Sequence, residues 1–375
     1  MLSAMKKHGL QVRIVFLAML LAGAPLLAQQ AALPESLANR IDGIVREQME
    51  MHHIPGLSIA IAEHGQIVFS RGYGFADLEN QMKATPETEF RTGSIAKPMT
   101  ATVAMKLWQE GKLDLDAPVQ KYCPAFPRKP WPVTTRELLG HLGGIRHYVD
   151  KPGAEPEILS AVHYAHIVDS FPIFANDPLV AEPGTKFEYS TYGYNVVGCV
   201  IEGASGETFM EALQQDVLGP AHMRETKRDD VFAIIPHRSR WYSPKPGGGI
   251  ENAHMVDTSN KVPGGGLLST SDDLARFAIA TMSGELVNDK TRGLMWTEQK
   301  TLAGKETGYG LGWSIRNDNG EREIVHTGGQ PGASTILYMV PGRGIALAVM
   351  TNVDASGLFP LTHEVIPLLE AVEKK

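Results

Sequence analysis

The sequence has little cysteine and no concentrated positive charge. Its 375 residues include only two cysteines, too few for a cysteine-based zinc cluster. Acidic residues outnumber lysine and arginine by 42 to 35, and no basic run marks a nucleic-acid-binding stripe. Internal repeats and low-complexity tracts are also missing. With 43% hydrophobic and 21% charged residues, the chain has the balance of a soluble globular protein with a large core and no nucleic-acid partner.

Several common site motifs are missing as well. His-Glu-x-x-His is absent despite 13 histidines, and the pair His163 and His166 is expected to have a surface or packing role. Residues 203–206 lack the spacing of a Gly-x-Ser-x-Gly nucleophile elbow. The glycines at 264–266 follow no clear strand and predict a turn before a helix near Ser271, not a dinucleotide loop. We therefore expect neither a metal nor a cofactor.

No apolar run is long enough to favour a membrane span, which needs about 20 residues. Residues 14–28 are apolar, follow three positive charges and end before two glutamines, the pattern of a secretory signal peptide. We predict cleavage after Ala28 and a periplasmic or secreted domain over residues 29–375, with an uncleaved anchor as the alternative. Export would permit a disulfide between Cys123 and Cys199, but a chain of this length does not need one to form a core, so we expect both to be unpaired.

Strand-like runs occur in two groups, one near each end of the chain. They are residues 57–62, 67–69, 323–326, 335–340 and 345–350. An amphipathic helix begins near Pro34, before the first group, and another covers residues 357–372 after the last. These elements predict a single α/β (α+β) domain with a five-stranded antiparallel sheet and both terminal helices on one face.

The middle of the chain is rich in proline, glycine and aromatic residues. Its apolar spacing is mostly helical or irregular, so residues 115–260 are expected to form a largely helical insertion. The two sheet halves would then span about 33–114 and 261–375. A cleft is expected where the insertion meets the sheet.

Ser94 and Lys97 are the first candidates for chemistry. A helical pattern begins at Ser94, where free N–H groups favour developing negative charge, and Lys97 lies on the same helix face. A serine hydroxyl needs a base, and a lysine can be that base only when burial or nearby positive charge lowers its pKa from about 10.4. Ser-x-x-Lys is a short pattern, however, which Ser3 and Lys6 also match. The alternative is a helix-capping serine and a solvated lysine.

Two later motifs make this pair more specific. The three motifs, in chain order, are Ser94-x-x-Lys97, Tyr189-Ser190-Thr191 and His326-Thr327-Gly328-Gly329. At these separations the sequence resembles the class C β-lactamase and penicillin-binding family over roughly residues 35–370. Its motifs are most similar to those of the lactamase-beta-like serine proteases.

The resemblance implies a β-lactamase/transpeptidase-like fold and an acyl-enzyme mechanism without a cofactor. Ser94 would be the acylated nucleophile, and Lys97 and Tyr189 would share the proton transfers. The backbone N–H groups of Ser94 and Gly329 would form the oxyanion hole. His326 would be the fourth catalytic side chain of the cleft. The remaining motif residues, with Gly329, would bind the substrate, and they are Thr191, Thr327 and Gly328.

Two positions depart from the family's pattern. Thr191 stands where many relatives have asparagine, so one amide donor is missing. His326 replaces a lysine, and a histidine with a pKa near about 6.5 is mostly neutral at pH 7. A permanent charge there would help to hold the carboxylate of a β-lactam or of a peptide C-terminus. Its loss favours esters, amides or internal peptide bonds.

We therefore predict an exported serine hydrolase acting on a small-molecule or peptide substrate. One alternative is a true β-lactamase, a D-Ala-directed carboxypeptidase or a D-aminopeptidase. Another is a non-catalytic sensor of the penicillin-binding type. The sequence names neither the natural substrate nor the oligomeric state.

Overall fold

A large antiparallel sheet forms one side of the structure, a computed structural model that describes residues 32–150, 153–318, 320–354 and 357–373. The predicted signal peptide, residues 1–28, lies outside the described residues. The sheet has seven strands in the order β3-β2-β1-β12-β11-β10-β9. In chain order they are β1 (Gly56–Glu63), β2 (Gln66–Asp77), β3 (Met82–Lys83), β9 (Ser314–Asp318), β10 (Glu321–Gln330), β11 (Ala333–Val340) and β12 (Ile345–Thr351).

The five predicted strands form the centre of this sheet, and β1 from the first half pairs with β12 from the second. The predicted strand count was too low because the sheet has a further strand at each edge. β3 is two exposed residues long, and β9 ends in Arg316, Asn317 and Asp318. Neither has the alternation of apolar and polar residues that marks a half-buried strand.

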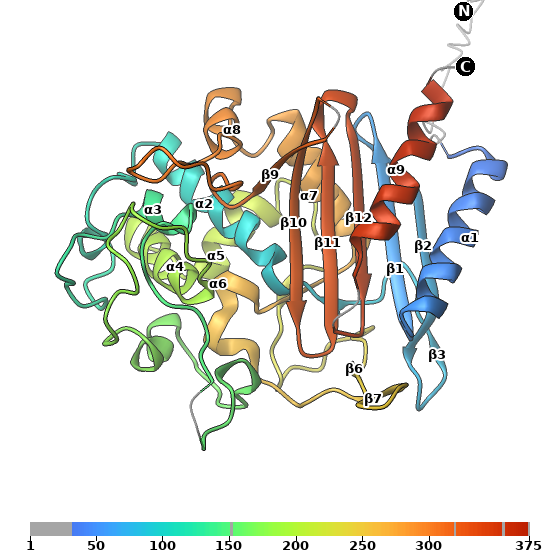
Figure 1. Cartoon of the computed structure of the whole chain (residues 1–375), viewed down its shortest axis with the longest axis horizontal. Coiled ribbons are helices and arrows are strands. Elements are labelled where there is room, and N and C mark those ends of the chain that lie inside the picture. The colour runs from blue at the N-terminus through green and yellow to red at the C-terminus, as the bar shows by residue number, and fades with distance from the viewer. Residues whose placement is uncertain (1–31, 151–152, 319, 355–356, 374–375) are drawn as a thin grey trace, which may run out of the picture. The chain divides into compact units, whose positions relative to one another are not determined.

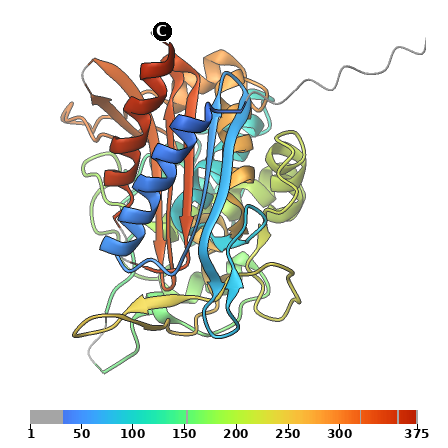
Figure 2. The ribbon, with the colours of Figure 1, turned by 90° about the vertical axis from the view of Figure 1, so that its right-hand side faces the viewer.

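The helices divide between the two faces of the sheet. The α-helices are α1 (Glu35–Met51), α2 (Ala96–Gln109), α3 (Thr135–Leu139), α4 (Thr191–Ser205), α5 (Phe209–Leu213), α6 (Val262–Gly265), α7 (Ser271–Ser283), α8 (Asp289–Met295) and α9 (Phe359–Glu373). The terminal helices α1 and α9 contact each other and lie together on one face, as predicted (Figures 1 and 2). The other face packs against α7, and the remaining helices lie beyond it (Figure 1).

Shorter elements complete the fold, most of them between β4 and β9. Two small sheets have the orders β4-β8-β5 and β6-β7, with β4 (Phe90–Arg91), β5 (Lys227–Arg228), β6 (Tyr242–Pro244), β7 (Ile250–Asn252) and β8 (Leu267–Ser269). The short helical turns are η1 (Gly93–Ile95), η2 (Val119–Lys121), η3 (Glu157–Leu159), η4 (Ile167–Ile173), η5 (Gln214–Leu218), η6 (Thr258–Lys261) and η7 (Pro341–Arg343). The helix predicted near Ser271 is α7, and it is capped by Thr270, whose hydroxyl accepts from the N–H of Asp273.

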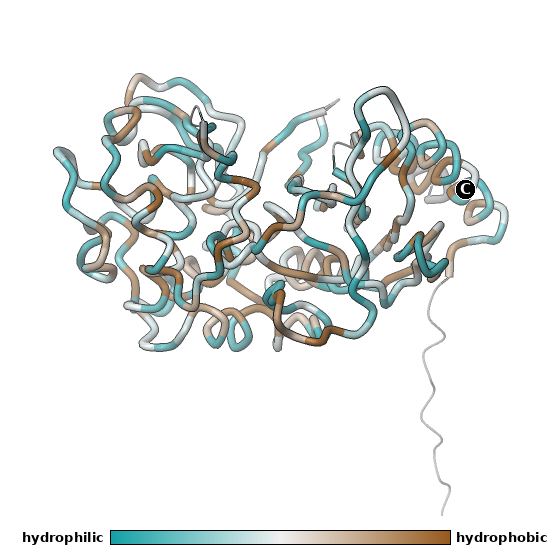
Figure 3. The backbone as a smooth tube through the Cα atoms, turned by 90° about the horizontal axis from the view of Figure 1, so that it is seen from below, coloured by the Kyte–Doolittle hydropathy of each residue, from teal (hydrophilic) through white to brown (hydrophobic). Residues whose placement is uncertain are grey.

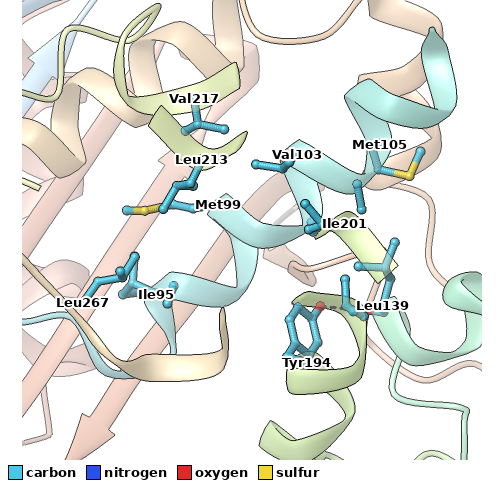
Figure 4. Packing of buried hydrophobic residues seen from close by; sticks show 14 of the residues in the cluster. Ile95, Met99, Val103, Met105, Leu139, Tyr194, Ile201, Leu213, Val217 and Leu267 are labelled. Atoms are coloured by element: carbon cyan, nitrogen blue, oxygen red, sulfur yellow. Dashed lines mark hydrogen bonds between the residues drawn. The ribbon is translucent and has the colours of Figure 1, made fainter. Parts of the chain in front are cut away.

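Helix α2 lies in the middle of the main hydrophobic core. Ile95, Met99 and Val103 pack among side chains from α4, α5 and β8, so almost no face of the helix reaches solvent (Figure 4). Burial on this scale stabilises each large apolar side chain by about 1.5–3 kcal/mol. The packing fixes the start of α2, and with it the position of Ser94 and Lys97.

Hydrophobic and hydrophilic residues are closely mixed along the backbone (Figure 3). Among the described residues, no helix is both long enough and apolar enough to cross a membrane.

Cys123 and Cys199 are joined by a disulfide, so the prediction that both are unpaired was wrong. Their Cα atoms are 5.4 Å apart, inside the range that a disulfide requires. Cys199 lies on α4, and both side chains are buried. Sequence spacing could not show this proximity, because it is created when α4 packs into the core.

We predict that a Cys123→Ser/Cys199→Ser variant keeps the fold but is less stable. The crosslink closes a loop across a sequence separation of 76, and loss of such a loop constraint costs about 4 kcal/mol. Urea unfolding of the oxidised protein and the double variant measures the difference. The disulfide in the wild type is first verified by mass. The same urea midpoint for the wild type and the double variant would then contradict the prediction.

Candidate active site

Ser94 lies in η1, at the start of the continuous helical segment that becomes α2. Gly93 before it has φ of +50°, a left-handed conformation that glycine adopts without the usual Cβ penalty. The chain therefore turns directly from β4 into the helix. The position gives the N–H of Ser94 no partner within the helix, so it is free to bind an anion.

Lys97 is fully buried and makes three polar contacts. Its Nζ lies 2.9 Å from Ser94 Oγ, 3.1 Å from Thr191 Oγ1 and 2.7 Å from the carbonyl oxygen of Gly264. The carbonyl can only accept, and the threonine oxygen can accept as well, so both can take an N–H of Lys97. A neutral amine would still have its lone pair for the third direction, toward the hydroxyl of Ser94.

The surroundings of Lys97 favour that neutral form. Burial, and then the positive charge of Lys261, lower the pKa of Lys97 well below its usual 10.5. Among the described residues no carboxylate pairs with it. The hydrogen bond to Ser94 and the lowered pKa are what a lysine acting as general base requires.

Tyr189 lies just before α4, beside the same pair. Ser190 caps this helix by accepting from the N–H of Gly193 and also donates to the carbonyl oxygen of Arg146, which fixes the preceding residue. Burial raises the pKa of Tyr189, and a hydrogen bond with Ser94 partly offsets this. The Lys97 Nζ lies 4.8 Å from the centre of its ring. The structure thus brings together the predicted Ser94, Lys97, Tyr189 and Thr191.

Two histidines support this arrangement. His141 accepts the N–H of Ser190 through Nδ1 at 3.2 Å, and its ring lies 4.2 Å from that of Tyr189. His147 accepts the N–H of Thr191 at 3.3 Å. Burial and the charge of Lys97 lower the pKa of both, that of His147 to about 4. Both rings are therefore neutral acceptors that orient the motif containing Tyr189.

Strand β10 passes close to the backbone around Ser94. A Cβ on Gly328 would lie 2.0 Å from the carbonyl oxygen of Thr92, and one on Gly93 would lie 2.7 Å from the nitrogen of Gly329. Only glycine permits this approach. It brings the backbone nitrogens of Ser94 and Gly329 to the same side of the cleft, as an oxyanion hole requires. Thr327 and Gly329 are the exposed positions on this part of the strand.

His326 is buried, and both of its ring nitrogens are occupied. Nδ1 lies 2.8 Å from the carbonyl oxygen of Thr327, so it must carry the proton, and Nε2 accepts the hydroxyl of Tyr309 at 2.8 Å. Burial, then the charge of Lys97, lower the pKa of His326 to about 3. His326 is thus neutral near pH 7, and because both ring nitrogens are engaged, neither is free to exchange a proton with a substrate.

The cavity in front of Ser94 is lined by residues from all of these elements. They are Gly93, Ser94, His147, Tyr148, Ile158, Thr191, Lys261, Gly264, Gly265, Gly329 and Gln330. Lys261 and Gln330 belong to no sequence motif, and only the fold brings them into this cavity. A larger cavity of about 300 Å³ borders Tyr164, Glu202 and Arg228, but no lysine lines it.

In the described part of the chain, no group of three or more histidine, cysteine, aspartate or glutamate side chains is arranged to hold a metal ion. His163 bonds Asp257 at 2.7 Å, and the backbone N–H of His166 donates to Asp169. Each residue of the predicted surface pair thus has a separate local role.

The chain matches the model of the Beta-lactamase family over residues 41–367. It therefore belongs to this family and is a serine hydrolase of the β-lactamase and penicillin-binding type. The human serine beta-lactamase-like protein LACTB, mitochondrial, is 30% identical over 81% of this chain and 74% of its own length. Protein flp of Staphylococcus aureus is 25% identical over 84% of this chain and 63% of its own length.

Solved structures show the same fold. An octameric penicillin-binding protein homologue from Pyrococcus abyssi is similar with a TM-score of 0.74 and 25% identity, over 88% of this chain and 77% of that one. The D-amino acid amidase from Ochrobactrum anthropi SV3 has a TM-score of 0.74 and 24% identity, over 90% of this chain and 99% of that one. The predicted β-lactamase/transpeptidase-like fold is thus confirmed.

Proposed function

We propose that the protein is an exported hydrolase that cleaves an ester, amide or peptide bond through an acyl-enzyme on Ser94. The observation that carries the proposal is the environment of Lys97. This lysine is buried, has no carboxylate partner among the residues that the structure describes, and lies 2.9 Å from the Ser94 hydroxyl. A neutral amine in that position can take the hydroxyl proton as Oγ attacks the substrate carbonyl.

The rest of the cycle follows from the same neighbours. The N–H groups of Ser94 and Gly329 would accept the negative charge on the tetrahedral oxygen. The proton taken from Ser94 would pass to the leaving group as the bond breaks, with Tyr189 completing the path. Water would then attack the acyl-enzyme and lose one proton, which the Tyr189 hydroxyl would relay to the neutral amine of Lys97. Lys97 would return this proton to Ser94 Oγ as the acyl bond breaks, which restores the serine. His326 would position β10 through its bond to Tyr309, and would not exchange protons.

Two observations support export. Residues 14–28 follow three positive charges in the pattern of a secretory signal. The disulfide between Cys123 and Cys199 is the kind of bond that persists outside the reducing cytosol. A periplasmic or secreted location fits both.

The neutral His326 argues against a substrate whose carboxylate is held at the start of this strand motif. That arrangement would serve a dedicated β-lactamase or a D-Ala-directed carboxypeptidase. We therefore favour esters, amides or internal peptide bonds. Penicillin hydrolysis faster than hydrolysis of the best ester would overturn this choice.

Intact-mass analysis tests the nucleophile. We expect a fluorophosphonate to add one adduct to the wild type, located on Ser94, and a p-nitrophenyl ester to give a transient acyl-enzyme. The Ser94→Ala variant should show neither, because it lacks the hydroxyl that lies 2.9 Å from Lys97 Nζ at the start of the helical segment.

Ser160→Ala is the matched control, since that serine lies outside the cavity in front of Ser94. It should label like the wild type. A persisting adduct in Ser94→Ala would remove Ser94 from the mechanism, and absence of any adduct in the wild type would remove the acyl-enzyme. Stable acylation by penicillin without release would favour a sensor.

A further inference from the structure

Lys261 ends η6 and is the second lysine buried at the cleft. Only 3% of the residue is exposed, and it lines the same cavity as Ser94. Its Nζ lies 5.3 Å from the centre of the Tyr148 ring. Within the described residues it has neither an ion-pair partner nor a hydrogen-bond acceptor. The acidic group whose charge it feels, Asp229, is already bonded to Arg91 at 2.8 Å.

A buried ammonium without a counter-ion is costly, and the described part of the chain gives Lys261 no carboxylate partner. Burial, then the charge of Arg91, lower its pKa to about 7. A negative group entering the cavity would favour the charged form and would recover the missing electrostatic stabilisation. Lys261 is thus suited to a ligand of opposite charge.

Gln330 provides an independent indication. It follows Gly329 on β10, is 5% exposed, and lines the same cavity. Both its Nε2 and its Oε1 are buried without a hydrogen-bond partner. Because buried amides almost always have partners, this side chain points to a polar group that occupies the cavity during function. An amide NH₂ can donate to a carboxylate beside an ammonium.

We propose that Lys261 and Gln330 form a subsite for a negatively charged group of the substrate, so that the enzyme prefers carboxylate-bearing esters or amides. This inference rests on the proposed Ser94 hydrolase and adds a substrate class to it. The charge would be held by η6 and the end of β10. The negative group of the substrate would not be held at position 326, where the strand motif of the family usually has a lysine and this chain has His326.

Lys261 also lowers the pKa of Lys97, so its removal alters the rate on every substrate. A comparison of charged with neutral substrates cancels that effect. Two pairs of esters are suitable, each with a charged member and a neutral one of similar shape. The first pair is mono-p-nitrophenyl adipate and p-nitrophenyl hexanoate, and the second is 4-acetoxybenzoate and its methyl ester. The first pair places the carboxylate on the acyl side and the second on the leaving group.

The measured quantity is the ratio of kcat/KM for the charged ester to that for its neutral partner. In Lys261→Met we expect this ratio to fall about 10- to 100-fold in at least one pair, mainly through KM, which is the range for a lost charge-assisted hydrogen bond. Gln330→Glu should lower the ratio in the same pair by repulsion. Methionine keeps the length of lysine, and thermal unfolding checks that the fold is retained.

Lys290→Met is the control, because that exposed lysine on α8 does not line the cavity. It removes one positive charge and should leave both ratios within about twofold. Unchanged ratios in Lys261→Met, with neutral esters still cleaved through Ser94, would overturn the subsite alone. Absence of any esterase activity or Ser94 adduct in the wild type would instead overturn the proposed function.

Discussion

A Lys97→Met variant is expected to lose about 100- to 10,000-fold in kcat/KM, the contribution of a well-placed general base. Methionine can occupy the buried channel of Lys97, but it cannot take the proton of Ser94. Its loss also leaves the carbonyl oxygen of Gly264 without the 2.7 Å hydrogen bond. Stopped-flow assays with a p-nitrophenyl ester measure the rate, and thermal unfolding reports whether the site is still assembled.

The pH dependence gives a second measurement on the same variant. The active form of Lys97 is the neutral amine, whose folded pKa is lowered by burial and by Lys261. Activity should therefore be present above that folded pKa and be lost as the pH falls through it. His326 adds no step above about 3. In Lys97→Met the residual rate should lose this acidic limb.

Lys106→Met serves as the control, because Lys106 lies on the same helix and pairs with Asp216 away from Ser94. It should keep both the rate and the acidic limb. An acidic limb that survives unchanged in Lys97→Met would assign the titration to another group and would contradict the role given to Lys97.

The second large loss of activity is expected when Gly328 of β10 is replaced. A Cβ on Gly328 would meet the backbone oxygen of Thr92 at 2.0 Å and the nitrogen of Ser94 at 3.1 Å, so Gly328→Ala must push the strand away from η1. The N–H of Gly329 would move with it. A displacement of about 1 Å in such a site can cost about 100-fold in rate, and we expect at least that loss in kcat.

Gly342→Ala is the matched variant, because Gly342 lies in the turn η7 between β11 and β12 and a Cβ there has no atom within 4 Å. The same change at this position should leave kcat within about threefold of the wild type. Equal losses in the two variants, or none in Gly328→Ala, would show that the close approach of β10 to η1 is not what forms the oxyanion hole.

The sequence predicted the sheet centre well because apolar periodicity and turn residues mark β1, β10, β11 and β12 directly. It missed the edge strands β3 and β9, where pairing with a longer neighbour, not local pattern, makes the strand. It also missed the disulfide, which depends on how α4 packs.

For the site, the motif residues were found, but their environment was not. The sequence could place Ser94 three residues before Lys97, yet the burial that lowers the pKa of Lys97 comes from segments distant in the chain. Lys261 and Gln330 belong to no motif, so only the fold brings them into the cavity. For His326 a neutral ring was predicted from its ordinary pKa. Burial and its bond to Tyr309 were visible only in the structure.

The division of the sheet between the two ends of the chain has a consequence for biosynthesis. Ser94 and Lys97 lie at the start of α2, whereas β10, with Gly329, is among the last elements to be made. A nascent chain would hold the proposed nucleophile long before Gly329, the residue proposed to give the second oxyanion-hole donor. Hydrolytic activity should therefore appear only once the C-terminal strands have joined the sheet, which would spare the cell from an active hydrolase during synthesis.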